Sequence, residues 1–237
     1  MNEKCPESSN RFSGLGRSPE IGVGVRAQLR PVLAATGEFL LVAVALMIVP
    51  LWLFVDVQVV GGPLGEASFT EVTQSLLLLF CVALFARRAV TLPAQRGFLT
   101  LVSGFMLCML IREQDQLLDV IYHGFWVIPA LATAGAAIGY ACSPGRRDTI
   151  LPAMARYIGS HSYYYMFFGV LMVLLFSRVF GSGSMLWEPV MGEHYNREIK
   201  TVIQEGLELF GYVLMAFSAW FFFRDTGNDE AGQETLV

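Results

Sequence analysis

The stretch VIQEGLELFGYVLMAFSAWFFF, residues 202–223, decides the fold class of this chain. A helix needs about 20 predominantly apolar residues to cross the hydrocarbon core of a bilayer, and this stretch meets that length. Its apolar character is interrupted near its start by Gln204, Glu205 and Glu208. The stretch therefore predicts a membrane-spanning helix that carries two carboxylates into the membrane from one end.

Five further apolar runs define the rest of the architecture. The chain is 54% hydrophobic and 15% charged, whereas a soluble domain averages about 25% charged residues. The runs are too long and continuous for the alternating strands of a membrane β-barrel, so helices are the remaining way to cross the bilayer. The runs lie at residues 33–55, 70–86, 98–112, 124–142 and 163–180. We therefore predict an all-α polytopic membrane protein with six transmembrane helices.

Two of these runs reach membrane length only when their polar ends are counted. The run at 70–86 needs the segment from Glu71 to Ser75, and the run at 98–112 needs the segment from Arg112 to Asp119. Polar side chains are therefore expected at the ends of two helices, close to the membrane surface.

Lys and Arg are distributed unevenly over the segments that connect the runs. With six spans, twelve of the sixteen basic residues fall on one side, which the positive-inside rule assigns to the cytoplasm. Both termini are then cytoplasmic, and the external side is acidic. The expected parts are a disordered basic cytoplasmic tail (1–32), a six-helix transmembrane domain (33–224) and an acidic cytoplasmic tail (225–237).

The start of the helix expected near residue 69 is polar on one face. Ser68 is a candidate N-cap with Glu71 three residues later, which is the spacing of a capping box. Capping alone explains Glu71 well. It does not explain Gln74, which lies one turn deeper on the same face. This helix start is therefore a candidate part of a site as well as a simple helix terminus.

A second polar segment, REQDQLLDVIYH at residues 112–123, follows the run at 98–112. If the helix continues, Asp115, Asp119 and His123 fall at i, i+4 and i+8 and line one face. If it breaks near Asp119, the three side chains still stay close to the tip of a helical hairpin. A solvated loop with Arg112 paired to Asp115 is the simpler alternative.

The helix that contains residues 202–223 carries the deepest acidic residues. Glu205 and Glu208 are at i and i+3, and Tyr212 follows one turn later on the same stripe. The helix macrodipole favours acidic residues in the first turn, but Glu208 lies too far along the helix for that explanation. We expect Glu208 to be buried and partnered, with Arg112 as its counter-charge.

These segments lie on the external side of the predicted topology and form one candidate constellation. Its members are Glu71, Gln74, Arg112, Glu113, Asp115, Asp119, His123, Glu205 and Glu208.

Several catalytic signatures are missing from the sequence, namely HExxH, GxSxG and a Walker loop. None of the four cysteines falls in an external loop, so no structural disulfide is expected. Zinc accepts imidazole nitrogen and carboxylate oxygen, so a divalent metal is one candidate occupant of the external cluster. Its candidate ligands are His123, Asp115, Asp119, Glu205 and Glu208.

Three motifs resemble a group of uncharacterised bacterial polytopic inner-membrane proteins. They are Thr70-Glu71-x-x-Gln74, the segment Arg112-Glu113-x-Asp115-x-x-x-Asp119 followed by His123-Gly124-Phe125-Trp126, and Glu205-x-x-Glu208-x-x-Gly211-Tyr212. The resemblance implies a multi-pass fold in the bacterial inner (cytoplasmic) membrane. It implies no particular activity.

Three functional hypotheses follow from the sequence. The first is an external polar site that binds a cation, a proton or a metal, because clustered carboxylates with a histidine and an arginine are a common source of perturbed protonation. The second is a structural or accessory subunit whose buried charge network fixes helix packing. The third is a small proton- or ion-coupled transporter. The expected partners are the lipid bilayer and a further membrane protein, and no nucleic acid is expected.

Overall fold

The computed structural model describes residues 21–60 and 68–234, and side chains within 29–60 and 68–227. The described residues are helical and contain no strand. They form two compact units, one up to Leu41 and one from Val42 onward. Of the two predicted tails, residues 1–20 and 235–237 lie outside the described residues, whereas residues 21–32 belong to α1 and residues 225–234 belong to α11.

The first unit consists of the greater part of helix α1 (Ile21–Leu46), which begins well before the predicted apolar run at residue 33. Its apolar side chains, such as Leu33 and Phe39, are exposed. Exposed apolar side chains along a helix of this length suit contact with lipid.

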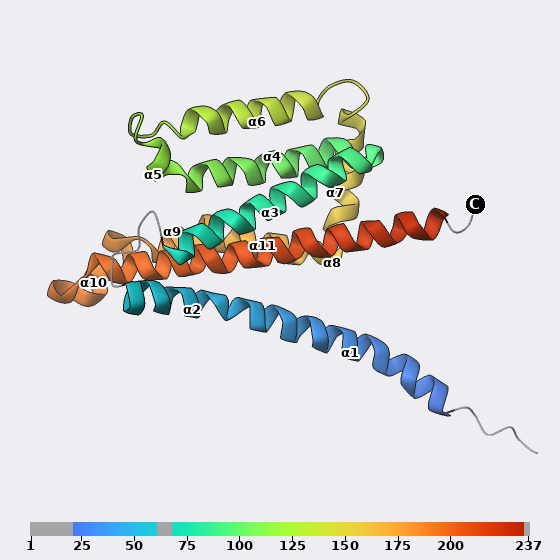
Figure 1. The fold of residues 1–237 in the computed structure, drawn as a ribbon, viewed down its shortest axis with the longest axis horizontal. Helices are drawn as coiled ribbons and strands as arrows, with labels where there is room; N and C mark the ends of the chain where they lie inside the picture. Colours follow the sequence, from blue (N-terminus) through green and yellow to red (C-terminus); the bar gives the residue numbers. More distant parts are fainter. Residues whose placement is uncertain (1–20, 61–67, 235–237) are drawn as a thin grey trace, which may run out of the picture. The chain divides into compact units, whose positions relative to one another are not determined.

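The second unit, called the bundle below, contains the end of α1 and all later helices. Its long helices lie roughly side by side along one direction (Figure 1). Helix α11 (Arg197–Glu234) contacts α2 (Ile48–Phe54), α3 (Phe69–Thr91) and α8 (His161–Leu171). Helix α3 also contacts α4 (Arg96–Glu113), and α4 contacts α6 (Val127–Ala141). Helix α11 is therefore the central element of the bundle.

Short helical segments connect these long helices. The π-helical segments are Val55–Val60, Met172–Phe176 and Gly183–Trp187, and the 3-10 segments are Pro93–Gln95, Arg147–Thr149 and Gly192–His194. The remaining short α-helices are α5 (Asp115–Leu118), α7 (Ile150–Ile158), α9 (Ser177–Phe180) and α10 (Glu188–Met191).

The core of the bundle lies between α3, α4 and α11. Leu78 and Phe85 of α3 pack with Met106 of α4 and with Met215 of α11, and each of these side chains is at most 1% exposed. Helices α8 and α11 cross so closely that a Cβ on Gly211 would lie 2.7 Å from the carbonyl oxygen of Gly169. Small residues permit such close approach between membrane helices.

Five helical spans among the described residues are long and apolar enough to cross a membrane. They are Leu29–Val60, Phe69–Thr91, Pro93–Glu113, His161–Phe180 and Arg197–Gly227. Each contains one of the predicted apolar runs, including the two that needed polar ends. The described residues are therefore mostly helical, and five of their helices are compatible with a multi-pass membrane protein.

The sixth predicted span, at residues 124–142, corresponds to the shorter helix α6 of 15 residues. At 1.5 Å per residue it is about 22 Å long, less than the roughly 30 Å of a hydrocarbon core. The start of the predicted run is a turn instead of a helix, because Gly124 adopts a left-handed conformation with φ of 84°. A sixth span and the cytoplasmic location of both termini stay predictions.

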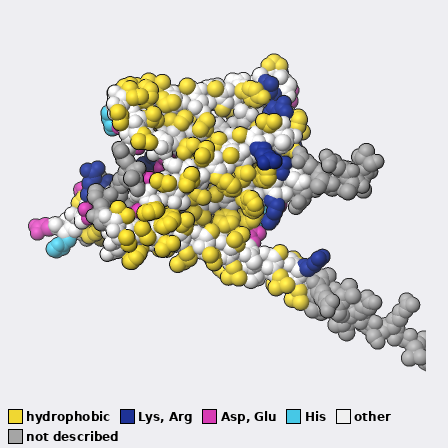
Figure 2. Space-filling view, viewed as in Figure 1, with side chains coloured by type: hydrophobic (Ala, Val, Ile, Leu, Met, Phe, Trp, Pro, Cys, Tyr) yellow, Lys and Arg dark blue, Asp and Glu magenta, His cyan; other side chains and the backbone are white. Residues whose placement is uncertain are grey.

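The two ends of the bundle differ in charge. One end of the bundle is the end toward which α11 runs to its C-terminus (Figure 1). The first residues of α4 and the last residues of α3 and α6 lie at this end. Apolar side chains cover the visible side of the bundle, and most of the visible Lys and Arg side chains lie at this end, with a smaller group at the opposite end (Figure 2). The start of α3, the end of α4 and the start of α11 lie at the opposite end, which brings the predicted polar segments together.

Candidate functional site

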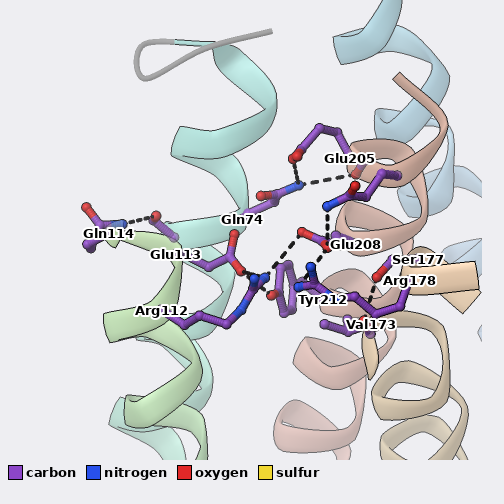
Figure 3. Close-up of polar contacts among 12 residues, drawn as sticks. Gln74, Arg112, Glu113, Gln114, Val173, Ser177, Arg178, Glu205, Glu208 and Tyr212 are labelled. Carbon is purple, nitrogen blue, oxygen red and sulfur yellow. Dashed lines mark hydrogen bonds and ion pairs between the residues drawn. The ribbon is translucent and has the colours of Figure 1, made fainter. Parts of the chain in front are cut away.

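A partly buried polar cluster lies between α3, α4, α9 and α11 (Figure 3), with the side chain of Arg178 47% exposed at its edge. Its hydrogen bonds and ion pairs join residues far apart in the sequence. We define the polar cluster as Gln74, Arg112, Glu113, Arg178, Gln204, Glu205, Glu208 and Tyr212.

The carboxylate of Glu208 is the centre of the cluster, with a side chain only 3% exposed. Its Oε2 lies 3.4 Å from Nη2 of Arg112, and its Oε1 lies 3.4 Å from Nη2 of Arg178. Both are long contacts, so they are ion pairs more than strong hydrogen bonds. The ion pair expected between Arg112 and Glu208 is thus present. A buried carboxylate needs such partners, because an unpaired buried charge is strongly destabilising.

A second carboxylate, Glu113, completes the pairing of Arg112. The guanidinium of Arg112 donates to Oε1 of Glu113, and the hydroxyl of Tyr212 donates to the same oxygen at 2.7 Å. Tyr212 is fully buried, and the side chain of Glu113 is 9% exposed. This arrangement ties the end of α4 to the middle of α11 and satisfies a buried phenol.

The third carboxylate, Glu205, has a different environment. Nε2 of Gln74 donates to Oε2 of Glu205 at 3.1 Å and to its backbone oxygen at 3.2 Å. Within the described part of the chain, no Lys or Arg side chain forms an ion pair with Glu205. The cluster therefore holds three carboxylates and two guanidinium groups.

Gln74 is itself unusual, because its side chain is completely buried and only half satisfied. Its amide nitrogen makes two hydrogen bonds, while its amide oxygen Oε1 is buried without a hydrogen-bond partner. A buried polar atom without a partner costs roughly 1–3 kcal/mol. A proton donor or a cation at this oxygen would remove that cost.

A cleft of about 260 Å³ reaches the edge of the cluster between α3 and the end of α4. Glu71 and Glu113 line it together with Ser75 and Gln114, and Nε2 of Gln114 donates to the Ser75 hydroxyl at 2.7 Å. Two carboxylates therefore line a cleft that adjoins the polar cluster at Glu113.

The segment 112–123 does not continue as one helix, so the stripe of Asp115, Asp119 and His123 that a continuous helix would form is absent, and the alternative of a helix break holds. Helix α4 ends at Glu113, and α5 covers only Asp115–Leu118. Asp119 and His123 still meet, with 2.7 Å between Oδ2 and Nδ1. The side chain of Asp115 makes no hydrogen bond or ion pair with any described residue.

The contact between Asp119 and His123 belongs to the turn that precedes α6. Oδ1 of Asp119 accepts the backbone N–H of Gly124 at 2.7 Å, which stabilises the left-handed turn at that glycine. This hydrogen bond, followed by the contact with His123, holds the pKa of the Asp119 carboxyl below its usual value. The His123 side chain is fully exposed. This pair therefore stabilises the turn before α6 and is separate from the polar cluster.

The structure thus divides the predicted constellation. It brings together Gln74, Arg112, Glu113, Glu205 and Glu208, and it places Glu71 in the adjoining cleft. Among the residues that the structure describes, no three His, Cys, Asp or Glu side chains gather as a metal site, and this includes the five candidate ligands.

Sequence reasoning missed two residues that matter here. Arg178 supplies the second guanidinium, and the signal was a single Arg inside the last turn of an apolar run. Asp56 caps α3: its carboxylate accepts the backbone N–H of Phe69 at 2.9 Å and that of Thr70 at 3.0 Å, and the Thr70 hydroxyl at 2.6 Å. The predicted N-cap is confirmed as well, since the Ser68 hydroxyl accepts the N–H of Glu71 at 3.1 Å.

Comparison of the chain with protein-family models, with curated proteins and with solved structures finds no match in any of the three.

Proposed function

We propose that this chain is a multi-pass protein of the bacterial inner membrane whose polar cluster takes up one proton or one cation on the external side, with Glu205 as the receiving carboxylate. One observation carries the proposal. Two guanidinium groups pair with Glu208 and Glu113, and the third carboxylate, Glu205, has a buried amide as its partner in place of a cation.

The chemistry of the Gln74–Glu205 pair supports a proton as the occupant. A carboxylic acid and an amide can exchange two hydrogen bonds, one from the amide N–H and one from the acid O–H. The amide N–H of Gln74 already donates to Glu205, and Oε1 of Gln74 is buried without a donor. A protonated Glu205 supplies the missing donor, and a cation bound between the same oxygens removes the same deficit.

Thermal unfolding of the purified protein tests this proposal. The midpoint is measured across pH, and at fixed pH with sodium, magnesium or choline chloride at equal ionic strength. Glu205→Gln carries a permanently neutral group of the same shape. We expect the unfolding midpoint of Glu205→Gln to depend less on pH or on cations than the midpoint of the wild-type protein does.

Glu198→Gln is the matched control, because Glu198 is an exposed residue at the start of the same helix. It should keep the wild-type dependence. Equal pH and cation profiles for the wild-type protein and Glu205→Gln would overturn the proposal.

A second function, that of a structural or accessory subunit, is favoured by a different observation. Glu208 is bound by guanidinium groups from two other helices, so it fixes the packing of α4, α9 and α11. In that case Glu205→Gln leaves the dependence on pH and cations unchanged, while substitution of Glu208 still lowers stability.

A further inference from the structure

A groove of about 750 Å³ lies along α3, α4 and α6, on a part of the bundle that the polar cluster does not use. Its walls are mostly apolar and built largely from small side chains, including Ala86, Gly104, Ala136 and Ala137, and they also carry the hydroxyl groups of Thr100, Ser103 and Thr133. Helices α4 and α6 approach closely at its floor, where a Cβ on Gly104 would lie 2.5 Å from that of Ala137. Grooves that hold small molecules have volumes of roughly 300–1,000 Å³.

A guanidinium group closes one end of this groove. Arg96 lines it, and its Nε and Nη2 donate to the backbone oxygens of Ala89 and Val90 at 3.0 and 3.1 Å. A guanidinium has five N–H donors, so others are left to bind a ligand. Arg96 is thus held at the groove by the last turn of α3.

A second guanidinium lies outside the lining of the groove and contacts one residue that lines it. Arg146 stacks over the ring of Tyr140, which lines the groove, at 4.0 Å from the ring centroid. Two hydrogen bonds tie the segment 146–149 to the start of α4. The N–H of Gly97 donates to the Thr149 hydroxyl at 2.9 Å, and that hydroxyl donates to the Arg146 carbonyl oxygen at 2.6 Å. The neighbouring carboxylate, that of Asp148, pairs with Arg147, with 3.6 Å between Oδ1 of Asp148 and Nε of Arg147.

We propose that this groove binds an anionic phospholipid, with an acyl chain along the apolar walls and the phosphate at Arg96 and Arg146. Arginine binds phosphate through charge-assisted and often bidentate hydrogen bonds. Basic pockets between membrane helices are suited to anionic lipid headgroups. The apolar helix of a second copy would fill the walls but leave both guanidinium groups without a counter-charge, whereas a phospholipid satisfies both parts of the site.

Lipid titration of the full-length protein in neutral detergent tests the proposal. The probes are phosphatidylglycerol and phosphatidylcholine with identical acyl chains, and the readouts are bound lipid by native mass spectrometry and the unfolding midpoint. We expect phosphatidylglycerol to bind more tightly and to raise the midpoint further. Arg96→Gln and Arg146→Gln should each weaken phosphatidylglycerol binding about fivefold.

Three further variants make the outcome decisive. Arg156→Gln removes an exposed charge on α7 that lies outside the groove, and it should bind as the wild-type protein does. Arg96→Lys keeps the charge if Arg96→Gln fails to fold. Ala136→Phe fills the groove and should abolish the preference for phosphatidylglycerol.

Three results would overturn the proposal. They are equal binding of the two lipids, an equal loss in Arg156→Gln, or a concentration-dependent dimer that Ala136→Phe dissociates. Displacement of the lipid by glycerol phosphate alone would assign the site to a free phosphate compound instead.

Discussion

The guanidinium of Arg178 and the carboxylate of Glu208 form an ion pair at 3.4 Å that joins a short helical turn to the central helix of the bundle. Arg178 lies in α9, directly after the π-helical segment Met172–Phe176, and Glu208 lies three turns into α11. Together with Arg112, this contact gives one buried carboxylate two cationic partners.

Removing the central carboxylate should be strongly destabilising. Glu208→Ala leaves Arg112 and Arg178 without their shared partner, and breaking a buried ion pair costs about 3–5 kcal/mol. Both guanidinium groups reach solvent, so we expect a loss of about 3 kcal/mol, at the lower end of that range. Chemical unfolding in detergent measures it. Glu193→Ala, an exposed residue, should change stability little, and equal effects of the two variants would contradict the proposed network.

Removing the hydroxyl of Tyr212 should show how much the hydrogen bond between α11 and Glu113 contributes to stability. Tyr212→Phe deletes the hydrogen bond to Oε1 of Glu113 at 2.7 Å and keeps the buried ring. Hydrogen bonds to charged groups contribute about 1.5–3 kcal/mol, and we expect a loss in that range. The unfolding midpoint is the measurement. Tyr122→Phe, on a half-exposed tyrosine, is the control and should have no comparable effect.

The cap formed by Asp56 should be important for the start of α3. Asp56→Ala removes the acceptor of two backbone N–H groups and of the Thr70 hydroxyl in a buried position. Loss of an N-cap costs about 0.5–2 kcal/mol, and burial of the orphaned donors puts the expected value at the upper end. Hydrogen exchange of the Phe69 and Thr70 amides should accelerate. Unchanged exchange at both amides would show that Asp56 is not the cap in the membrane.

The turn at Asp119 should open in acid. Because its folded pKa is lower than the ordinary value of about 3.9, Asp119 stabilises the turn above that value. The stabilisation is lost as pH falls through the lower folded pKa. Exchange protection and the chemical shift of the Gly124 amide report this transition. Asp119→Asn should abolish it, and a transition that persists in this variant would assign it to another group.

Length and composition predicted most of the fold. The apolar runs identified all five spans, because a membrane helix needs a long apolar stretch whatever its neighbours are. The same reasoning overestimated the span before residue 142. Residues Gly124 to Trp126 carry no charge, so the sequence includes them in the apolar run. They form a turn because Asp119 accepts the N–H of Gly124 and because Gly124 adopts a left-handed conformation.

The site was predictable in part. Depth along the helix identified Glu208 as a residue that needs a partner, and Arg112 is that partner. Arg178 was not identified, because its role depends on where α9 meets α11, which no local pattern specifies. The sequence groups Asp115, Asp119 and His123 with the cluster because they lie at the same predicted end of the bundle. The chain after Glu113 forms the short helix α5 and a turn, and the Asp119–His123 pair of that turn is separate from the cluster.

The most direct test of the central claim is the infrared spectrum of the purified protein near neutral pH, compared with that of Glu205→Gln. A protonated carboxyl absorbs as a C=O stretch that is resolved from the carboxylate bands. If Glu205 receives a proton, the wild-type spectrum contains such a band, which Glu205→Gln lacks and Glu198→Gln retains. If a cation occupies the site instead, the band appears when cations are removed. A spectrum in which Glu205→Gln changes no carboxyl or carboxylate band under either condition would contradict the account.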